Sequence, residues 1–119
     1  MIVAVDFDGT LFMTGRIGST VPALPCNPVI ALCKRLRSEG HRIILWTCRM
    51  PGQGLEEAVL LCLDQGLEFD AVNENLPETL EKWGDCRKIL ADVYIDNRGC
   101  HPLHILEEPE HIYSLLTPK

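Results

Sequence analysis

The sequence predicts an α/β fold: a doubly wound parallel sheet in a single domain that spans residues 1–119. Apolar stretches of strand length alternate with segments of helical periodicity, which is the order typical of a parallel sheet covered by helices. Two of these stretches, 2–6 and 42–47, are almost entirely apolar, as strands buried on both faces are. Neither the length of 119 residues nor the share of 46% hydrophobic residues calls for a second domain.

The first half of the chain predicts two strands separated by a loop and a helix. Residues 2–6 form the first strand, and an irregular segment that contains glycine and proline follows over 7–23. Asn27 is expected to cap a helix that ends at Gly40, and the strand over 42–47 comes next. The inward face of this helix is expected to consist of Val29, Leu32, Cys33 and Leu36.

The second half of the chain continues the alternation. It predicts a helix over 55–65, a strand over 69–72, a short helix over 79–83 and a strand over 93–96. The inward face of the longer helix is expected to consist of Leu55, Val59, Cys62 and Leu63. The tail adds a short strand over 103–106 and a final helix over 109–116.

Composition and charge narrow the class of protein. A formal net charge of −6 argues against a free-standing nucleic-acid binder, which is usually basic. No apolar run approaches the roughly 20 residues that span a membrane, and the opening residues MIVAVDFDG lack the basic start of a secretory signal. We therefore expect a cytoplasmic protein. Its basic residues gather between 34 and 42 and are expected on a solvated helix face and at the start of the next strand.

The six cysteines are expected to be reduced thiols. No pair forms a C-x-x-C motif, so neither a zinc site nor a redox motif is predicted. Cys33 and Cys62 fall within the apolar faces of the two longer helices and are expected in the core.

Polar side chains follow the carboxyl ends of the predicted strands, where doubly wound sheets bind their ligands. Asp6 and Asp8 follow the first strand, and two carboxylates this close repel one another unless a cation or a reaction needs them. Carboxylate oxygens suit Mg²⁺, for which Asp6 and Asp96 form a partial shell with the backbone carbonyl of Asp8. The other strand ends supply Thr47, Cys48, Asn73, Glu74, Asn75 and Asn97.

Four segments resemble the motifs of the haloacid dehalogenase (HAD) superfamily, in order and over nearly the whole chain. Residues 3–10, VAVDFDGT, resemble motif I, and residues 43–47, IILWT, resemble motif II. Arg87 and Lys88 resemble motif III, and residues 91–96, ADVYID, resemble motif IV. Because neither gap between the motifs is long enough for a separate cap domain, the chain is similar to capless HAD proteins with a Rossmann-like sheet.

The resemblance implies a Mg²⁺-dependent phosphomonoesterase that acts through an aspartyl-phosphate. Its implied substrate is a small phosphorylated metabolite, such as a sugar phosphate or a nucleotide. In this correspondence Asp6 is the nucleophile, Asp8 is the general acid/base, and Lys88 offsets charge on the phosphoryl group. The expected Mg²⁺ ligands are Asp6, Asp8 and Asp96, of which Asp8 acts through its backbone carbonyl.

Four residues are expected to contact the substrate. The Thr47 hydroxyl and the backbone N–H of Cys48 match the phosphoryl-binding pair of motif II. Arg49 either contacts the substrate or makes a structural ion pair, and Asn75 either lines the pocket or belongs to an ordinary turn. Trp83 either stacks on a ring of the substrate or packs against a loop.

Several alternatives stay open at the level of sequence. Lys82 competes with Lys88 for the motif III position. Asn97 stands where many family members carry a second acid, which leaves open a phosphate-binding or regulatory module with little turnover. A receiver-like signalling domain uses similar side chains, but Asp6 lies too near the chain start for that pattern. Without a cap, either the loop over 12–21 or a second copy of the chain, in a homo-oligomer, is expected to close the site.

Overall fold

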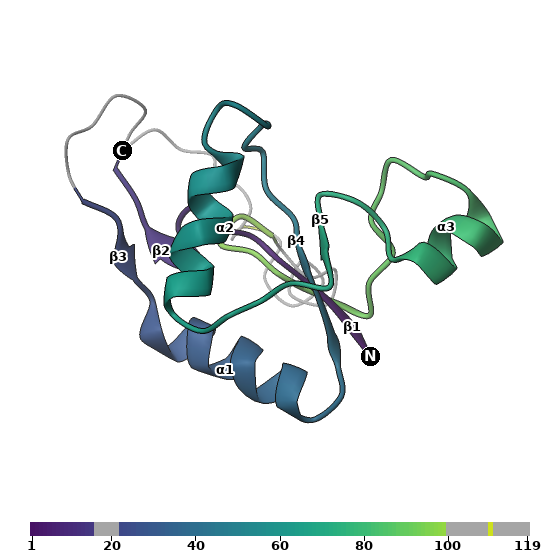
Figure 1. Ribbon diagram of the computed structural model, residues 1–119, viewed down its shortest axis with the longest axis horizontal. Coiled ribbons are helices and arrows are strands. Elements are labelled where there is room, and N and C mark those ends of the chain that lie inside the picture. The colour runs from purple at the N-terminus through teal and green to yellow at the C-terminus, as the bar shows by residue number, and fades with distance from the viewer. Residues whose placement is uncertain (16–21, 100–109, 111–119) are drawn as a thin grey trace.

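A four-stranded parallel sheet lies at the centre of the computed structural model, which describes residues 1–15, 22–99 and 110 (Figure 1). The strand order is β5, β4, β1, β6, so the winding reverses beside β1 as in Rossmann-like folds. The predicted α/β fold with a parallel sheet is confirmed, although each strand is shorter than expected. The strands are β1 (Ile2–Val5), β4 (Arg42–Leu45), β5 (Ala71–Val72) and β6 (Val93–Ile95).

Two helices cover one face of the sheet. The helices α1 (Asn27–Ser38) and α2 (Leu55–Asp64) lie on the same side in Figure 1. Cys33 and Cys62 are core residues, as predicted, and burial raises the pKa of their thiols to about 11 and about 12. The centre of this core consists of Val3, Val5, Ile30, Cys33, Ile43, Leu45, Ala58 and Cys62.

The other face is covered by the segments that flank α3 (Pro77–Trp83). Ala4 and Ile44 on this face pack against Leu76 and Ile89, which precede and follow α3. The helix α3 itself lies on the opposite side of the sheet from α1 and α2 (Figure 1). This face has the smaller of the two cores, and the pocket described below lies on it.

An antiparallel ribbon begins within the predicted irregular segment over 7–23 and ends just after it. In this ribbon β2 (Phe12–Met13) pairs with β3 (Leu24–Pro25). Phe12 also stacks on Phe7, with ring centroids 5.1 Å apart, which fixes the ribbon to the main core. Strands of two residues are too short to show an alternating pattern, so the sequence carried no signal for them.

Two details of the helices differ from the prediction. The residue before Asn27 is the N-cap of α1, and Asn27 is the first helical residue, so the predicted Asn27 cap is wrong. Leu32 and Leu63 were expected to face inward, but they are 44% and 48% exposed. The reason is that each helix buries only a narrow stripe, which is centred on Cys33 in α1 and on Cys62 in α2.

Some predicted elements fall outside the described residues. This holds for the strand over 103–106, and for the helix over 109–116 apart from Glu110. Within residues 1–15, 22–99 and 110, no helix is long and apolar enough to cross a membrane.

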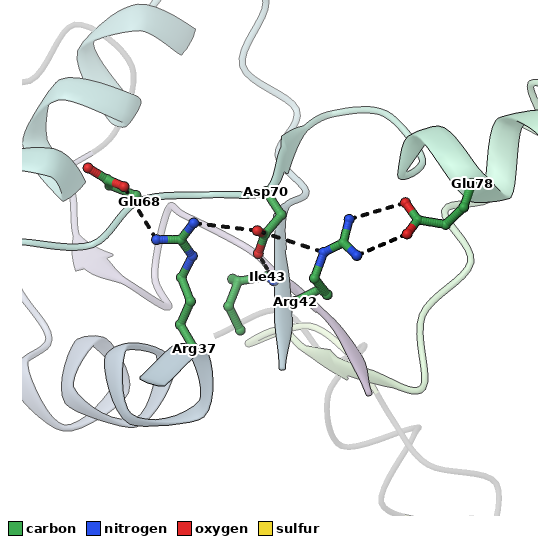
Figure 2. A network of polar contacts seen from close by, with 6 residues as sticks. All are labelled: Arg37, Arg42, Ile43, Glu68, Asp70 and Glu78. Atoms are coloured by element: carbon green, nitrogen blue, oxygen red, sulfur yellow. Dashed lines mark hydrogen bonds and ion pairs between the residues drawn. The ribbon is translucent and has the colours of Figure 1, made fainter. Parts of the chain in front are cut away.

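A network of ion pairs ties the amino-terminal ends of the strands to helices on both faces (Figure 2). Asp70 accepts a hydrogen bond from the Ile43 N–H at 2.7 Å and lies 3.4 Å from Arg37 and 3.8 Å from Arg42. Arg42 also donates two hydrogen bonds to Glu78 of α3, at 2.9 and 3.1 Å. Arg37 and Arg42, expected on a solvated face and at a strand start, are therefore paired, and they hold α1 and α3 at the pole opposite the candidate site.

Candidate functional site

The carboxyl ends of β4, β1 and β6 bring three side chains into one row. The Trp46 N–H donates to the Val5 carbonyl at 2.8 Å, and the Asp6 N–H donates to the Ile95 carbonyl at 2.9 Å. These bonds continue the parallel registers of the strands, so Asp6 has Trp46 on one side and Asp96 on the other. Residues in register on neighbouring strands point to the same face of a sheet, so the three side chains border one space.

That space is a pocket of about 290 Å³ on the face covered by the α3 segment. Lys88 lines it, and its Nζ lies 5.7 Å from the centre of the Tyr94 ring. Lys82 is not a lining residue; it belongs to α3, where its Nζ lies 5.1 Å from the centre of the Trp83 ring. The geometry therefore favours Lys88 over Lys82 as the lysine of the site. The lining residues are Ala4, Asp6, Trp46, Lys88, Tyr94, Ile95, Asp96 and Gly99.

Asp6 is an electrostatically strained carboxylate. Burial is the main cause that raises the pKa of Asp6 above its usual value, and the nearby charges of Asp96 and Asp8 raise it further. Hydrogen bonds from the Phe7 N–H and the Thr10 hydroxyl, the latter at 3.4 Å, oppose this increase. Excess negative charge at one place is what a bound cation would relieve.

The Asn97 amide links the two carboxylates of the row. With its nitrogen turned toward them, Asn97 donates to Asp96 Oδ1 at 3.2 Å and to Asp6 Oδ2 at 3.3 Å. Gly9 makes room for this amide, because a Cβ on Gly9 would lie 2.5 Å from it. Gly9 also has a φ of +77°, a conformation that favours glycine. Asn97, which departs from the HAD pattern that the sequence resembles, is therefore in contact with both carboxylates of the row.

Asp8 points away from this row and into a clamp formed by Arg49. The Arg49 Nε donates to Asp8 Oδ2 at 3.0 Å and its Nη2 donates to Oδ1 at 2.8 Å, while the Thr14 hydroxyl donates to Oδ1 at 2.8 Å. These bonds, with Arg49 the largest contributor, lower the pKa of Asp8 below its usual value. Arg49 is held by the Gly54 carbonyl at 3.1 Å and lies 4.7 Å from the centre of the Phe7 ring. The structural alternative for Arg49 is thus the one observed.

The loop after β4 is shaped by Asn73. Its Oδ1 accepts the Thr47 N–H at 2.8 Å, and its Nδ2 donates to the Arg49 carbonyl at 3.2 Å. Asn73 adopts a φ of +55°, which asparagine tolerates better than most residues. Thr47 is half-buried and Cys48 is exposed, next to the carboxyl end of β4. Neither Thr47 nor Cys48 lines the pocket itself.

Asn75 does not belong to the site. It is 1% exposed, its Oδ1 accepts the Leu90 N–H at 2.7 Å, and its Nδ2 donates to the Cys86 carbonyl at 3.3 Å. The expected role of Asn75 in substrate binding is therefore corrected to a structural one. By fixing the chain on both sides of Lys88, the Asn75 amide orients the segment that carries this lysine.

The donor set fits Mg²⁺. Asp6 and Asp96 are hard oxygen donors in one pocket, and Asp96 raises the pKa of Asp6, so the pair carries unneutralised charge. Among the described residues, no three side chains of histidine, cysteine, aspartate or glutamate are grouped to hold a metal ion. Two carboxylates with a backbone carbonyl and waters remain a sufficient shell for Mg²⁺, which keeps several waters. The Asp8 side chain, engaged by Arg49, is excluded from this shell in the present conformation.

Trp46 and Tyr94 are pocket residues that the sequence patterns did not predict. A signal for Trp46 existed, because it precedes Thr47 and the alternation along a strand sends it to the face opposite Leu45. Tyr94 lies opposite Ala4 in the register of β1 and β6, and this pairing depends on the tertiary structure. The partners of Asp8 had no local signal either, because Arg49 is 41 residues away in the chain.

Comparisons with known proteins found a solved structure that is similar to this chain over its whole length. No family model matches the chain, and no curated protein matches it. A solved structure of a conserved protein coded by a locus of Bacteroides thetaiotaomicron is 31% identical to it, with a TM-score of 0.68. The similarity covers 99% of this chain and 98% of that chain, so the two share their whole length.

Proposed function

We propose that this chain, which belongs to the same family as the conserved protein of Bacteroides thetaiotaomicron, is a Mg²⁺-dependent phosphomonoesterase of the HAD type. One observation carries the proposal: Asp6, near the start of the chain, lines one pocket with Lys88 and Asp96, which follow more than 80 residues later. A carboxylate nucleophile, a cation and a second carboxylate are the groups that phosphoryl transfer through an aspartyl-phosphate needs. The substrate is a small phosphorylated metabolite.

The proposed reaction has two steps. A carboxylate oxygen of Asp6 attacks phosphorus while the bond from phosphorus to the leaving oxygen breaks, and a protonated Asp8 donates its proton to that oxygen. In the second step the Asp8 carboxylate takes a proton from water, which attacks phosphorus and releases phosphate from Asp6. Lys88, the Thr47 hydroxyl and the Cys48 N–H offset charge on the phosphoryl oxygens.

The Arg49 clamp bears on the role of Asp8. In this conformation both oxygens of Asp8 accept hydrogen bonds, which suits the ionised form that acts as a base. To act as an acid, Asp8 must leave Arg49 and take up a proton. A turn of the Asp8 side chain is therefore part of the proposed cycle.

Asp6 and Asp96, with the backbone carbonyl of Asp8, would hold Mg²⁺. When bound, the ion supplies positive charge that keeps Asp6 ionised and neutralises the phosphoryl oxygens. With its amide nitrogen turned toward them, Asn97 donates to both carboxylates and keeps them side by side.

The test is phosphate release from a panel of sugar phosphates, nucleotides and phosphorylated ends, in Mg²⁺ and in EDTA. Release in Mg²⁺ only is expected. Lys88→Ala is expected to lower kcat/KM by about 100-fold, because it removes a charge that the transition state needs. Lys82→Ala is the matched control and is expected to stay within about twofold, as surface substitutions do. Release that survives EDTA, or a larger loss in Lys82→Ala, would contradict the proposal.

A second candidate, a phosphate-binding or regulatory module, is favoured by the same clamp. If Asp8 stays bound to Arg49, Asp6 can accept a phosphoryl group but water is not activated to remove it. The two candidates differ in turnover. A protein that carries one stable phosphate on Asp6 and releases none over many equivalents of substrate would be the module.

A further inference from the structure

The wall of the pocket beside the proposed nucleophile is aromatic. Trp46 flanks Asp6 across one strand spacing, about 4.8 Å, and Tyr94 lies one row below it, opposite Ala4. Both residues line the pocket, and both keep exposed surface, 36% for Trp46 and 43% for Tyr94. Large apolar rings that remain open beside a polar centre are typical of small-molecule sites.

The two rings are not equivalent. Tyr94 is held in place, because its hydroxyl donates to the Ile89 carbonyl and Lys88 lies over its ring. For Trp46, no aromatic or cationic side chain of the described residues stacks on the ring. Trp46 is thus the ring that can accept a stacking partner.

We infer that Trp46 stacks on a planar aromatic ring carried by the leaving group of the substrate. The inference rests on the proposed function and deepens it: the substrate class is a phosphomonoester of a ring-bearing alcohol, such as a nucleoside monophosphate or an aryl phosphate. A pocket of about 290 Å³ lies at the small end of ligand sites, so it suits one such unit rather than a polymer. With phosphorus at Asp6, the ring lies against Trp46.

The other tryptophan does not fit this role. Trp83 lies on α3, is 63% exposed and has Lys82 near its ring, and it does not line the pocket. Of the two tryptophans in the chain, Trp46 takes the stacking role that the sequence left open for Trp83.

Because the chain has two tryptophans, fluorescence can report on Trp46 alone. The probe protein is the full chain with Trp83→Phe, and with Asp6→Asn to prevent turnover. Titration with adenosine 5′-monophosphate and with phenyl phosphate in Mg²⁺ is expected to quench Trp46 in a saturable way. Glycerol phosphate and inorganic phosphate are expected to bind, by calorimetry, without quenching.

The outcomes distinguish failure of the stacking role of Trp46 from failure of the proposed function. Quenching by both ring phosphates supports the inference, and quenching by only one of them supports it and identifies the source of the ring. Binding of inorganic phosphate without quenching by any ring phosphate overturns the inference alone. Failure of the protein with Asp6 intact to bind inorganic phosphate in Mg²⁺ overturns the proposed function, and the inference with it.

Enzyme kinetics provide an independent test of the stacking role of Trp46, with Asp6 intact. Trp46→Leu keeps an apolar side chain but removes the ring, and it is expected to raise KM for ring phosphates about tenfold, as loss of one stacking contact does. Trp46→Phe is expected to restore KM, and Trp83→Phe, the control, is expected to change nothing. Glycerol phosphate should show the same KM in all variants. An equal loss on ring and acyclic substrates would indicate a structural role for Trp46 and overturn the inference.

Discussion

At the scale of single residues, Asp6 is both the proposed nucleophile and a carboxylate that destabilises the fold when it is ionised. Burial and the charges of Asp96 and Asp8 raise its pKa, so holding it ionised at neutral pH costs free energy in the folded state. The cost falls on the residue that the proposed reaction needs as a nucleophile. The carboxylate charge therefore destabilises the metal-free protein, and a bound cation would offset this cost, as the proposed function requires.

Asp6→Asn is expected to abolish phosphate release and to stabilise the metal-free protein. A group whose folded pKa is raised contributes stability below its unfolded pKa and loses it as pH rises through the folded pKa, so the Asp6 carboxylate costs stability at pH 7. Removing the charge should raise the free energy of unfolding by about 1 kcal/mol, measured by urea denaturation in EDTA. Asp85→Asn, at an exposed position, is the control and should have no effect. A less stable Asp6→Asn protein would contradict this account.

At the scale of elements, the turn after β1 sends its two aspartates to different partners. The Gly9 N–H donates to the Phe12 carbonyl at 2.8 Å and the Thr10 N–H donates to the Phe7 carbonyl at 3.1 Å, which closes the turn against the β2–β3 ribbon. Asp6, before the turn, faces the pocket, and Asp8, within it, faces Arg49. The left-handed Gly9 is the residue that permits this reversal.

Gly9→Ala and Gly40→Ala form a matched pair. Both glycines have positive φ, +77° and +92°, so each alanine should lose about 1 kcal/mol from the strained backbone. Only Gly9→Ala also drives a Cβ against the Asn97 amide, because nothing lies within 4 Å of a Cβ on Gly40. We expect Gly9→Ala to be the more destabilised in thermal unfolding, and to lose phosphate release. Equal stability losses with full activity in both variants would remove Gly9 and Asn97 from the site.

At the scale of the whole molecule, ion pairs close the structure at both ends of the sheet. The network of Asp70, Arg37, Arg42 and Glu78 joins both faces at the amino-terminal pole. At the opposite pole, Arg49 joins the loop after β4 to Asp8 in the loop after β1. Charge pairing is therefore part of how this acidic chain, with a net charge of −6, holds its loops together.

The second of these links predicts a pH dependence of stability. Arg49 lowers the pKa of Asp8, so the pair stabilises the protein above the unfolded pKa and the contribution is lost as pH falls through the lower, folded pKa. Arg49→Gln should cost about 1 kcal/mol at pH 7, because Asp8 is 43% exposed and solvent screens the pair. The difference from wild type should shrink in denaturation curves taken at progressively lower pH. Arg98→Gln, the same charge change at an exposed position, is the control, and a pH-independent deficit in Arg49→Gln would refute the clamp.

The sequence by itself determined the order of the helices and of the strands of the parallel sheet, and the position of the polar residues at the ends of these strands. Both depend on local patterns, because buried parallel strands need apolar runs and these runs end at the charged residues Asp6 and Asp96. The topology then brings these ends to one edge of the sheet. Chain order was enough to expect Asp6 and Asp96 together, whereas Lys88 was expected beside them only from the resemblance of its segment to motif III.

Only the tertiary structure decided which side chains meet. The bidentate contact of Arg49 with Asp8, the burial of Asn75 and the position of Trp46 beside Asp6 join residues far apart in the chain. Such contacts depend on strand register and on packing across the sheet, where a shift of one residue would turn each side chain to the opposite face. Sequence patterns place a residue along its own strand, whereas its neighbours are set by the strands beside it.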